Sequence, residues 1–204
     1  MQDRLNIPPT KSSLLDMKRR LLFLNEGYRL LERKRELLTR LVYEKLKQYR
    51  QLNRSTRETM SEAYRWLSIL QMRMGSFRLQ QLSVGMSEAI EAKVLPRRSM
   101  SVQYPSVEIR KLPLQPVGIL GTDASLDETR SSFADMLVKA AKLAEIETAL
   151  GRLLEEQRKT QKRVNALKYN VIPRFKRTIK YIESSLEEEE RNNLFQLKLL
   201  AQQG

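Results

Sequence analysis

Apolar residues recur at heptad spacing through the first third of the chain. Stepping by seven from Leu14 and from Met17 gives eighteen positions, of which thirteen are apolar or aromatic. A seam sustained over this length with charged flanks is typical of a coiled coil. Two prolines and then Thr10, a residue suited to an N-cap, precede the seam. The pattern therefore predicts one long helix over residues 10–74.

A second seam of the same kind occupies the last third of the chain. It runs from Leu143 to Val171 and resumes one residue late at Phe175, with later apolar positions that include Leu194 and Leu197. Proline removes one helical hydrogen bond, so Pro173 predicts a kink or register adjustment rather than a helix end. A helix over residues 123–201 is expected, with Ser125 opening a capping box that Glu128 completes.

The segment between the two helices, residues 75–122, has a different composition. It holds four of the seven prolines, together with β-branched and aromatic residues. Two short strands are expected at Met100–Gln103 and Ser106–Arg110, and one short helix within Gly75–Lys93.

Two long helices at opposite ends of the chain can bury their seams against each other if the middle segment lets the chain reverse. The expected fold class is mainly all-α: a long antiparallel two-helix coiled coil, with a small central segment that contains a short β-hairpin. Setting Leu14 beside Leu194 places the cations of residues 18–20 next to the acidic run of residues 187–190. The seam residues expected to form the core are Leu14, Leu21, Leu24, Leu31, Leu38, Leu150, Leu153, Val164 and Leu167.

Composition excludes several classes of function. The chain has no cysteine and no histidine, so disulfides, Cys/His zinc sites and histidine acid–base chemistry are ruled out. No phosphate-binding or dinucleotide-binding glycine motif is present, and we expect no catalytic site, no cofactor and no metal. No apolar run is long enough to span a bilayer, and the expected location is cytoplasmic. The net charge of +14 favours acidic partners.

Several stretches resemble the D subunit of the V-type (vacuolar/archaeal-type) ATP synthases and ATPases. The C-terminal ones are Arg163–Pro173, Thr178–Ile182 and Glu188–Arg191; the others are Leu14–Leu38 and Met100–Glu108. The residues that carry the C-terminal resemblance are Asn165, Ala166, Leu167, Ile172, Pro173 and Ile179. Lys168 and Tyr28 depart from the family pattern, where an acidic residue and a histidine are frequent.

The resemblance implies a non-catalytic central-stalk rotor subunit. Its coiled-coil tip would enter a hexamer of catalytic and non-catalytic subunits. The middle of the chain would lie near the small F subunit and the funnel-shaped subunit on the membrane rotor ring. Rotation would couple ATP hydrolysis or synthesis to proton or sodium transport. The subunit would be peripheral to the membrane, in the soluble sector of the complex, without inserting into the bilayer or binding nucleic acid.

Basic side chains outside the seam are the candidates for contact with an acidic hexamer cavity. They are Lys18, Arg19, Arg20, Arg33, Lys34, Arg35, Lys162, Arg163, Arg174, Lys176 and Arg177. Without the resemblance, solvated faces or pairing within one helix would explain them better. The alternative function is a basic coiled-coil adaptor that binds nucleic acid or an anionic surface, although no nucleic-acid motif is present.

Overall fold

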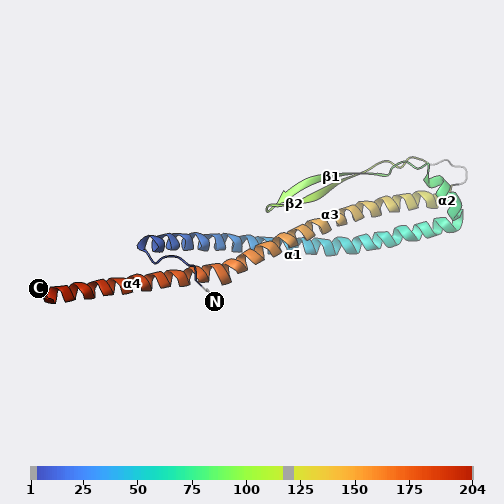
Figure 1. Cartoon of the computed structure of the whole chain (residues 1–204). Coiled ribbons are helices and arrows are strands. Elements are labelled where there is room, and N and C mark those ends of the chain that lie inside the picture. The colour runs from blue at the N-terminus through green and yellow to red at the C-terminus, as the bar shows by residue number, and fades with distance from the viewer. Residues whose placement is uncertain (1–3, 117–121, 204) are drawn as a thin grey trace. The chain divides into compact units, whose positions relative to one another are not determined.

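The computed structural model describes residues 4–116 and 122–203. Residues 117–121, part of the predicted central segment, lie outside the described residues. The element order is α1 (Lys11–Met74), α2 (Ser76–Ser83), β1 (Ile90–Ser99), β2 (Val102–Lys111), α3 (Ala124–Ala166), the π-helical segment η1 (Leu167–Val171) and α4 (Ile172–Gln203) (Figure 1). The chain forms two compact units. Unit 1 holds residues 1–37 and 157–204, and unit 2 holds residues 38–156.

Helix α1 begins where its capping residue predicts. The backbone N–H of Ser13 donates to Thr10 Oγ1 at 3.1 Å, which satisfies one of the free amides at the helix start. The helix continues without interruption for 64 residues.

The second long helix also extends across the predicted range, but its first residue is Ala124. Ser125 therefore lies buried inside the first turn, and the expectation that it caps the helix is wrong.

The register adjustment predicted near Pro173 is present as the π-helical segment η1. The N–H of Ile172 donates to the carbonyl of Leu167, five residues back, so the segment contains one residue more than an α-helical turn. This extra residue explains why the apolar pattern resumes one position late. Val171 is half-buried, whereas Ile172 is buried and continues the core into α4. The wider turn also lets the chain pass Pro173 without ending the helix.

The core of unit 1 lies between the first turns of α1 and helix α4. Met17, Ile179 and Ile182 are buried there. Partly buried residues surround them: Leu5, Ile7, Leu14, Leu21, Phe175 and Leu186. Leu5 and Ile7 come from the segment before α1, and the Leu5 N–H donates to Thr178 Oγ1 at 2.9 Å. Arg4 lies over the ring of Tyr181 at 3.9 Å. The N-terminal segment thus packs on α4, which heptad analysis does not reveal.

The antiparallel direction within unit 1 is as predicted, but the predicted alignment is wrong by one heptad. Lys18 pairs with Glu183 at 2.7 Å rather than with the acidic run at 187–190. Lys11, one heptad earlier, pairs with Glu190 at 2.9 Å. A shift of seven residues keeps every seam position facing its partner helix, so seam periodicity alone does not distinguish the two alignments.

Unit 2 pairs the rest of α1 with α3. Tyr64 and Phe133 meet edge to face with 5.7 Å between their ring centroids. Arg73 Nη1 lies 2.8 Å from Asp123 Oδ2 where α1 ends and α3 begins. Leu38 and Leu153 are buried in a second core, against which Val42 packs.

Strands β1 and β2 form an antiparallel hairpin, also in unit 2. The predicted second strand lies inside β2, but the predicted first strand, Met100–Gln103, is wrong because it spans the turn. Met100 and Ser101 have positive φ angles of 49° and 67°. A two-residue turn of this kind matches the twist of the flanking strands. The usual sequence signal for such a turn is Asn-Gly, and the Met-Ser sequence does not give that signal.

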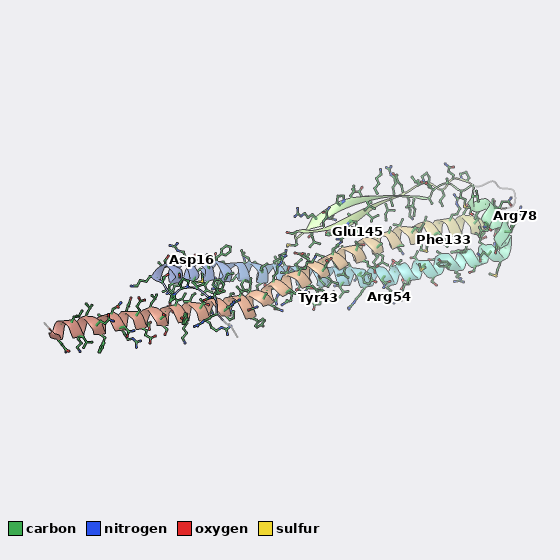
Figure 2. The ribbon with its side chains drawn as sticks, in the orientation of Figure 1. Asp16, Tyr43, Arg54, Arg78, Phe133 and Glu145 are labelled. Atoms are coloured by element: carbon green, nitrogen blue, oxygen red, sulfur yellow. The ribbon has the colours of Figure 1, made fainter. Side chains whose placement is uncertain are left out.

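Two carboxylates of α3 bind the hairpin: Asp135 pairs with Lys111 at the end of β2, and Glu145 contacts the middle of the same strand. Glu145 accepts a hydrogen bond from the Val107 N–H at 3.0 Å and another from Ser106 Oγ at 3.1 Å (Figure 2). Val102, at the start of β2, is buried with Leu38 and Leu153. The protein is therefore all-α with one small β-hairpin, as the sequence predicts.

Candidate interaction surfaces

The candidate seam residues all lie in the protein interior or at its margin. Leu38, Leu153 and Val164 are buried. The remaining six, Leu14, Leu21, Leu24, Leu31, Leu150 and Leu167, are half-buried. None of the nine is exposed, and their burial agrees with a place along the seams between the helices.

The residues that carry the family resemblance divide between core and surface. Ile172 and Ile179 are buried, and Leu167 and Pro173 are half-buried around the π-helical segment. Asn165 and Ala166 are exposed. Most of this group therefore supports the π-helical adjustment and the core of unit 1.

A polar layer interrupts the seam in unit 1. Arg35 pairs with Glu32 at 2.6 Å and donates to Gln161 Oε1 at 3.5 Å across to α3. Glu32 Oε2 and Thr160 Oγ1 are buried in the same unit and have no hydrogen-bond partner among the residues that the structure describes. Polar seam groups weaken a coiled coil but restrict its register.

The eleven basic candidates do not form one equivalent set. Eight are exposed, whereas Lys34, Arg35 and Arg174 are half-buried. Several are already engaged inside the chain: Lys18 with Glu183, Arg20 with Asp16, and Arg35 with Glu32, while Lys34 and Arg177 also have intramolecular partners. Within the described residues, the exposed candidates without an ion pair are Arg19, Arg33, Lys162, Arg163 and Lys176.

Positive charge is concentrated in one stretch of unit 1. From Gln157 to Ile182 the sequence has nine lysines and arginines and no acidic residue. Of the five exposed candidates without an ion pair, four come from α1 or the end of α3, and Lys176 comes from α4. A band of this kind attracts acidic surfaces at a range of about 8–10 Å at physiological salt.

The end of α4 carries an apolar surface that the seam analysis misinterpreted. Leu194 and Leu197 belong to the predicted seam, but they are 66% and 63% exposed. Helix α1 begins at Lys11, whose partner is Glu190, so α4 continues beyond its partner helix from Arg191 onward. Every described side chain from Glu187 to Gln202 is exposed. The sequence offered one signal for this exposure. With Lys11, the first residue of α1, set beside Glu190, no part of α1 remains to cover the residues after Glu190.

This C-terminal extension, residues 191–203, carries large apolar side chains between its polar ones. Besides Leu194 and Leu197, Phe195, Leu199 and Leu200 are exposed, and together they fall on all sides of the helix. Helix α1 adds exposed Leu15, Leu22, Phe23 and Leu30 in the same unit. Exposed apolar side chains that gather in this way are typical of interaction sites.

Two titratable groups in charged contacts are perturbed. A hydrogen bond with Glu190, and the attraction of that carboxylate, raise the pKa of Lys11. Hydrogen bonds from Ser125 and Arg73 lower the pKa of Asp123. Both are structural contacts at helix ends.

Across residues 4–116 and 122–203, no cluster of acidic side chains could hold a metal ion, and no described helix is apolar enough over a sufficient length to cross a membrane.

Known proteins match this chain over almost its whole length. A family described as the D subunit of ATP synthase matches residues 13–202. The A-type ATP synthase D subunit of Pyrococcus furiosus is 35% identical over 202 residues, which cover 97% of this chain and 94% of the relative. The V-type ATP synthase D subunit of Thermotoga neapolitana is 36% identical over 197 residues, which cover 96% and 97%. The A-type ATP synthase D subunit of Pyrococcus abyssi is 37% identical, with 97% of this chain and 94% of the relative covered. The chain belongs to the family of ATP synthase D subunits.

Proposed function

We propose that this chain is the central rotor subunit of a V-type ATP synthase or ATPase. In this role it couples ATP hydrolysis or synthesis in a catalytic hexamer to rotation of the membrane ring that transports ions. The subunit has no catalytic site of its own. It belongs to the soluble sector of the complex on the cytoplasmic side, peripheral to the membrane.

The observation that carries the proposal is the unpaired C-terminal extension. The extension continues helix α4, so it needs no nucleation of its own, but its residues lack the tertiary packing that supplies most helical stability in proteins. Residues 191–203 have no partner helix among the described residues, yet carry leucine and phenylalanine on all sides. Such a helix is stabilised when another protein surrounds it. A central cavity in a hexamer supplies that environment.

The basic band of unit 1 supports a second contact with the same hexamer. Long-range charge attraction centres a turning subunit without locking it in one orientation, because the contacts stay hydrated and are weak individually. The exposed cations Lys162, Arg163 and Lys176 suit this role better than Lys18 or Arg20, which already have carboxylate partners. The proposal therefore requires that the hexamer cavity facing these cations be acidic.

The family membership supports a proposal of two further partners. The small F subunit of the central stalk and the funnel-shaped subunit on the membrane ring are proposed to bind the part of the chain that contains α2 and the hairpin. Unit 1 is then the part of the chain that is proposed to contact the hexamer.

The test is to purify the complex through a tag on this chain and quantify the bound hexamer. Leu194, Leu197 and Leu200 are replaced together by serine, and the control replaces Asn192, Gln196 and Gln202 by serine. Loss of three large apolar contacts is expected to reduce bound hexamer by tenfold or more, since each buried leucine contributes about 1.5–3 kcal/mol. Equal hexamer recovery from both variants would contradict the role of the extension.

A second variant tests the charged contact. Neutralising Lys162, Arg163 and Lys176 together is expected to lower torque and hexamer binding, and the effect should shrink as salt rises. The same salt series distinguishes the rotor role from the alternative function, a basic adaptor that binds nucleic acid or an anionic surface. Binding of a basic coiled coil to nucleic acid falls steeply with salt and is removed by nuclease. The rotor subunit is expected to keep its hexamer after nuclease treatment in moderate salt.

A further inference from the structure

The segment before α1, residues 4–9, is extended and lies on the helices of unit 1 with one apolar side. Leu5, Ile7 and Pro9 are half-buried, whereas the even-numbered residues of the segment are exposed. Alternation with a period of two is typical of extended backbone that places one face on a surface. Leu5 and Ile7 pack against the buried core of unit 1. We call this segment the strap.

Two polar contacts hold the strap on α4. The Leu5 N–H donates to Thr178 Oγ1 at 2.9 Å. The guanidinium of Arg4 lies 3.9 Å from the centre of the Tyr181 ring. Thr178 is fully buried, and a buried hydroxyl is costly unless it is hydrogen-bonded. Its Oγ1 donates to the Arg174 carbonyl at 2.9 Å within α4, and the strap supplies the donor that this oxygen accepts.

The strap is joined to α1 by tight turns. The Thr10 N–H donates to the Pro8 carbonyl at 3.0 Å, and the Ile7 N–H donates to the Leu5 carbonyl at 3.1 Å. The strap therefore returns from the start of α1 along α4 (Figure 1). Pro8 and Pro9 fix their φ angles, so the segment loses less conformational entropy when it lies down on the helix.

The end of unit 1 that the strap covers has little else to hold α1 on α4. Met17 is the only buried residue of α1 before Leu38. The ion pairs that Lys11 and Lys18 make with α4 are largely exposed, and such pairs contribute little to stability. The packing of the strap is therefore a substantial part of what joins the two helices at this end.

We propose that the strap opens and closes, and that its closure holds the first turns of α1 on α4. One backbone hydrogen bond, one cation–π contact and two half-buried side chains hold it, so it opens more readily than the helices unfold. When it is open, the first turns of α1 separate from α4 and the core around Met17 meets water. When it is closed, the exposed leucines of α1 and of the C-terminal extension keep a fixed spacing.

The strap is a property of this chain alone and does not rest on the proposed function. In the rotor role, its closure would present the two apolar surfaces of unit 1 to the hexamer as one rigid body. Recovery of the hexamer tests that role separately, because the experiment on the strap uses the purified full-length chain without partners.

The experiment measures the distance between α1 and α4 by pulsed electron spin resonance of two spin labels. The sequence has no cysteine, so Arg19→Cys and Lys180→Cys, both at exposed positions, give unique attachment sites. The labelled chain with its native strap is the reference. Adding Leu5→Ser and Ile7→Ser is expected to create a population at longer distance. Amide protection at residues 14–21 should fall about tenfold, because two half-buried apolar side chains leave the core.

Asn6→Ser is the matched control, because Asn6 lies on the exposed side of the strap, and it should leave the distances unchanged. Thr178→Val removes the acceptor of the Leu5 N–H at similar side-chain size, and a smaller population at longer distance is expected. This variant decides the question if circular dichroism shows that the double serine variant does not fold. Distances equal to the reference in the deciding variant would overturn the inference. So would an equal change in the Asn6 control.

Discussion

Lys18 Nζ lies 2.7 Å from Glu183 Oε1, and this contact marks the antiparallel register of unit 1. Lys11 and Glu190 repeat it one heptad away, at 2.9 Å. Both pairs are largely exposed, with side chains 39–77% accessible, so each stabilises the protein little. Their value lies in identifying which heptads face each other.

A double-mutant cycle tests this register. Replacing Lys18 and Glu183 by alanine, singly and together, should show a coupling of about 0.2–1 kcal/mol in the free energy of unfolding. The matched cycle with Lys18 and Glu190 should show none, because Glu190 is bound to Lys11. Urea denaturation at low salt measures both. Coupling in the second cycle alone would support the alignment that sets Lys18 beside the acidic run at 187–190.

Two glycines in helix interiors are predicted to limit stability. At Gly27 and Gly151, a Cβ atom would have no other atom within 4 Å, so alanine meets no steric obstacle. Each substitution to alanine should raise the free energy of unfolding by about 0.5–1 kcal/mol, because glycine loses more backbone entropy in a helix. Thermal unfolding measures the gain. Gly75→Ala is the contrasting variant and should destabilise, since its φ of 78° disfavours a side chain.

The hairpin is predicted to loosen when its carboxylate anchor is removed. Glu145→Ala deletes the acceptor for the Val107 N–H and the Ser106 hydroxyl. We expect faster amide exchange across β1 and β2, with the long helices little changed. Glu147→Ala, an exposed neighbour on α3, serves as the control. Unchanged exchange at Val107 in the Glu145 variant would show that Val102 and the Lys111–Asp135 ion pair hold the hairpin without Glu145.

The start of α3 is predicted to weaken in acid. The pKa of Asp123 is lowered by hydrogen bonds from Ser125 and Arg73, so its ionised form is favoured in the folded protein. Its stabilising contribution is present above the pKa of the unfolded chain and is lost as pH falls through the lowered folded value. The protection of the amides near Leu126, taken relative to the intrinsic exchange rate at each pH, should therefore fall over that range. Asp123→Asn should remove this pH dependence, whereas Asp127→Asn should retain it.

The helical architecture was predictable because heptad spacing and capping residues act locally. The bounds of α1 follow from Thr10 and from the loss of the pattern at Gly75. The late resumption of the seam at Phe175 predicted a register adjustment, and the π-helical turn supplies it. These features depend on residues within one or two turns of each other.

Features that depend on distant packing were not predictable in the same way. The one-heptad error in alignment arose because either register buries the seam. The packing of Leu5 and Ile7 on α4 lies outside any heptad pattern. The hairpin turn at Met100 and Ser101 adopts positive φ without glycine or asparagine. The leucines of the extension are exposed because α1 begins at Lys11 and does not lie beside them. Heptad periodicity assigned them to the core because it does not show where the partner helix begins.

Rotation of this chain inside the hexamer is the central claim, and single-molecule observation tests it most directly. The sequence has no cysteine, so one cysteine introduced at an exposed position of unit 2, such as Arg50, provides a unique attachment point on this chain for a bead. The hexamer is fixed to the surface and ATP is supplied. The account predicts continuous rotation of the bead in one direction, which stops when ATP is removed. A bead that stays fixed while the same complexes hydrolyse ATP would contradict it.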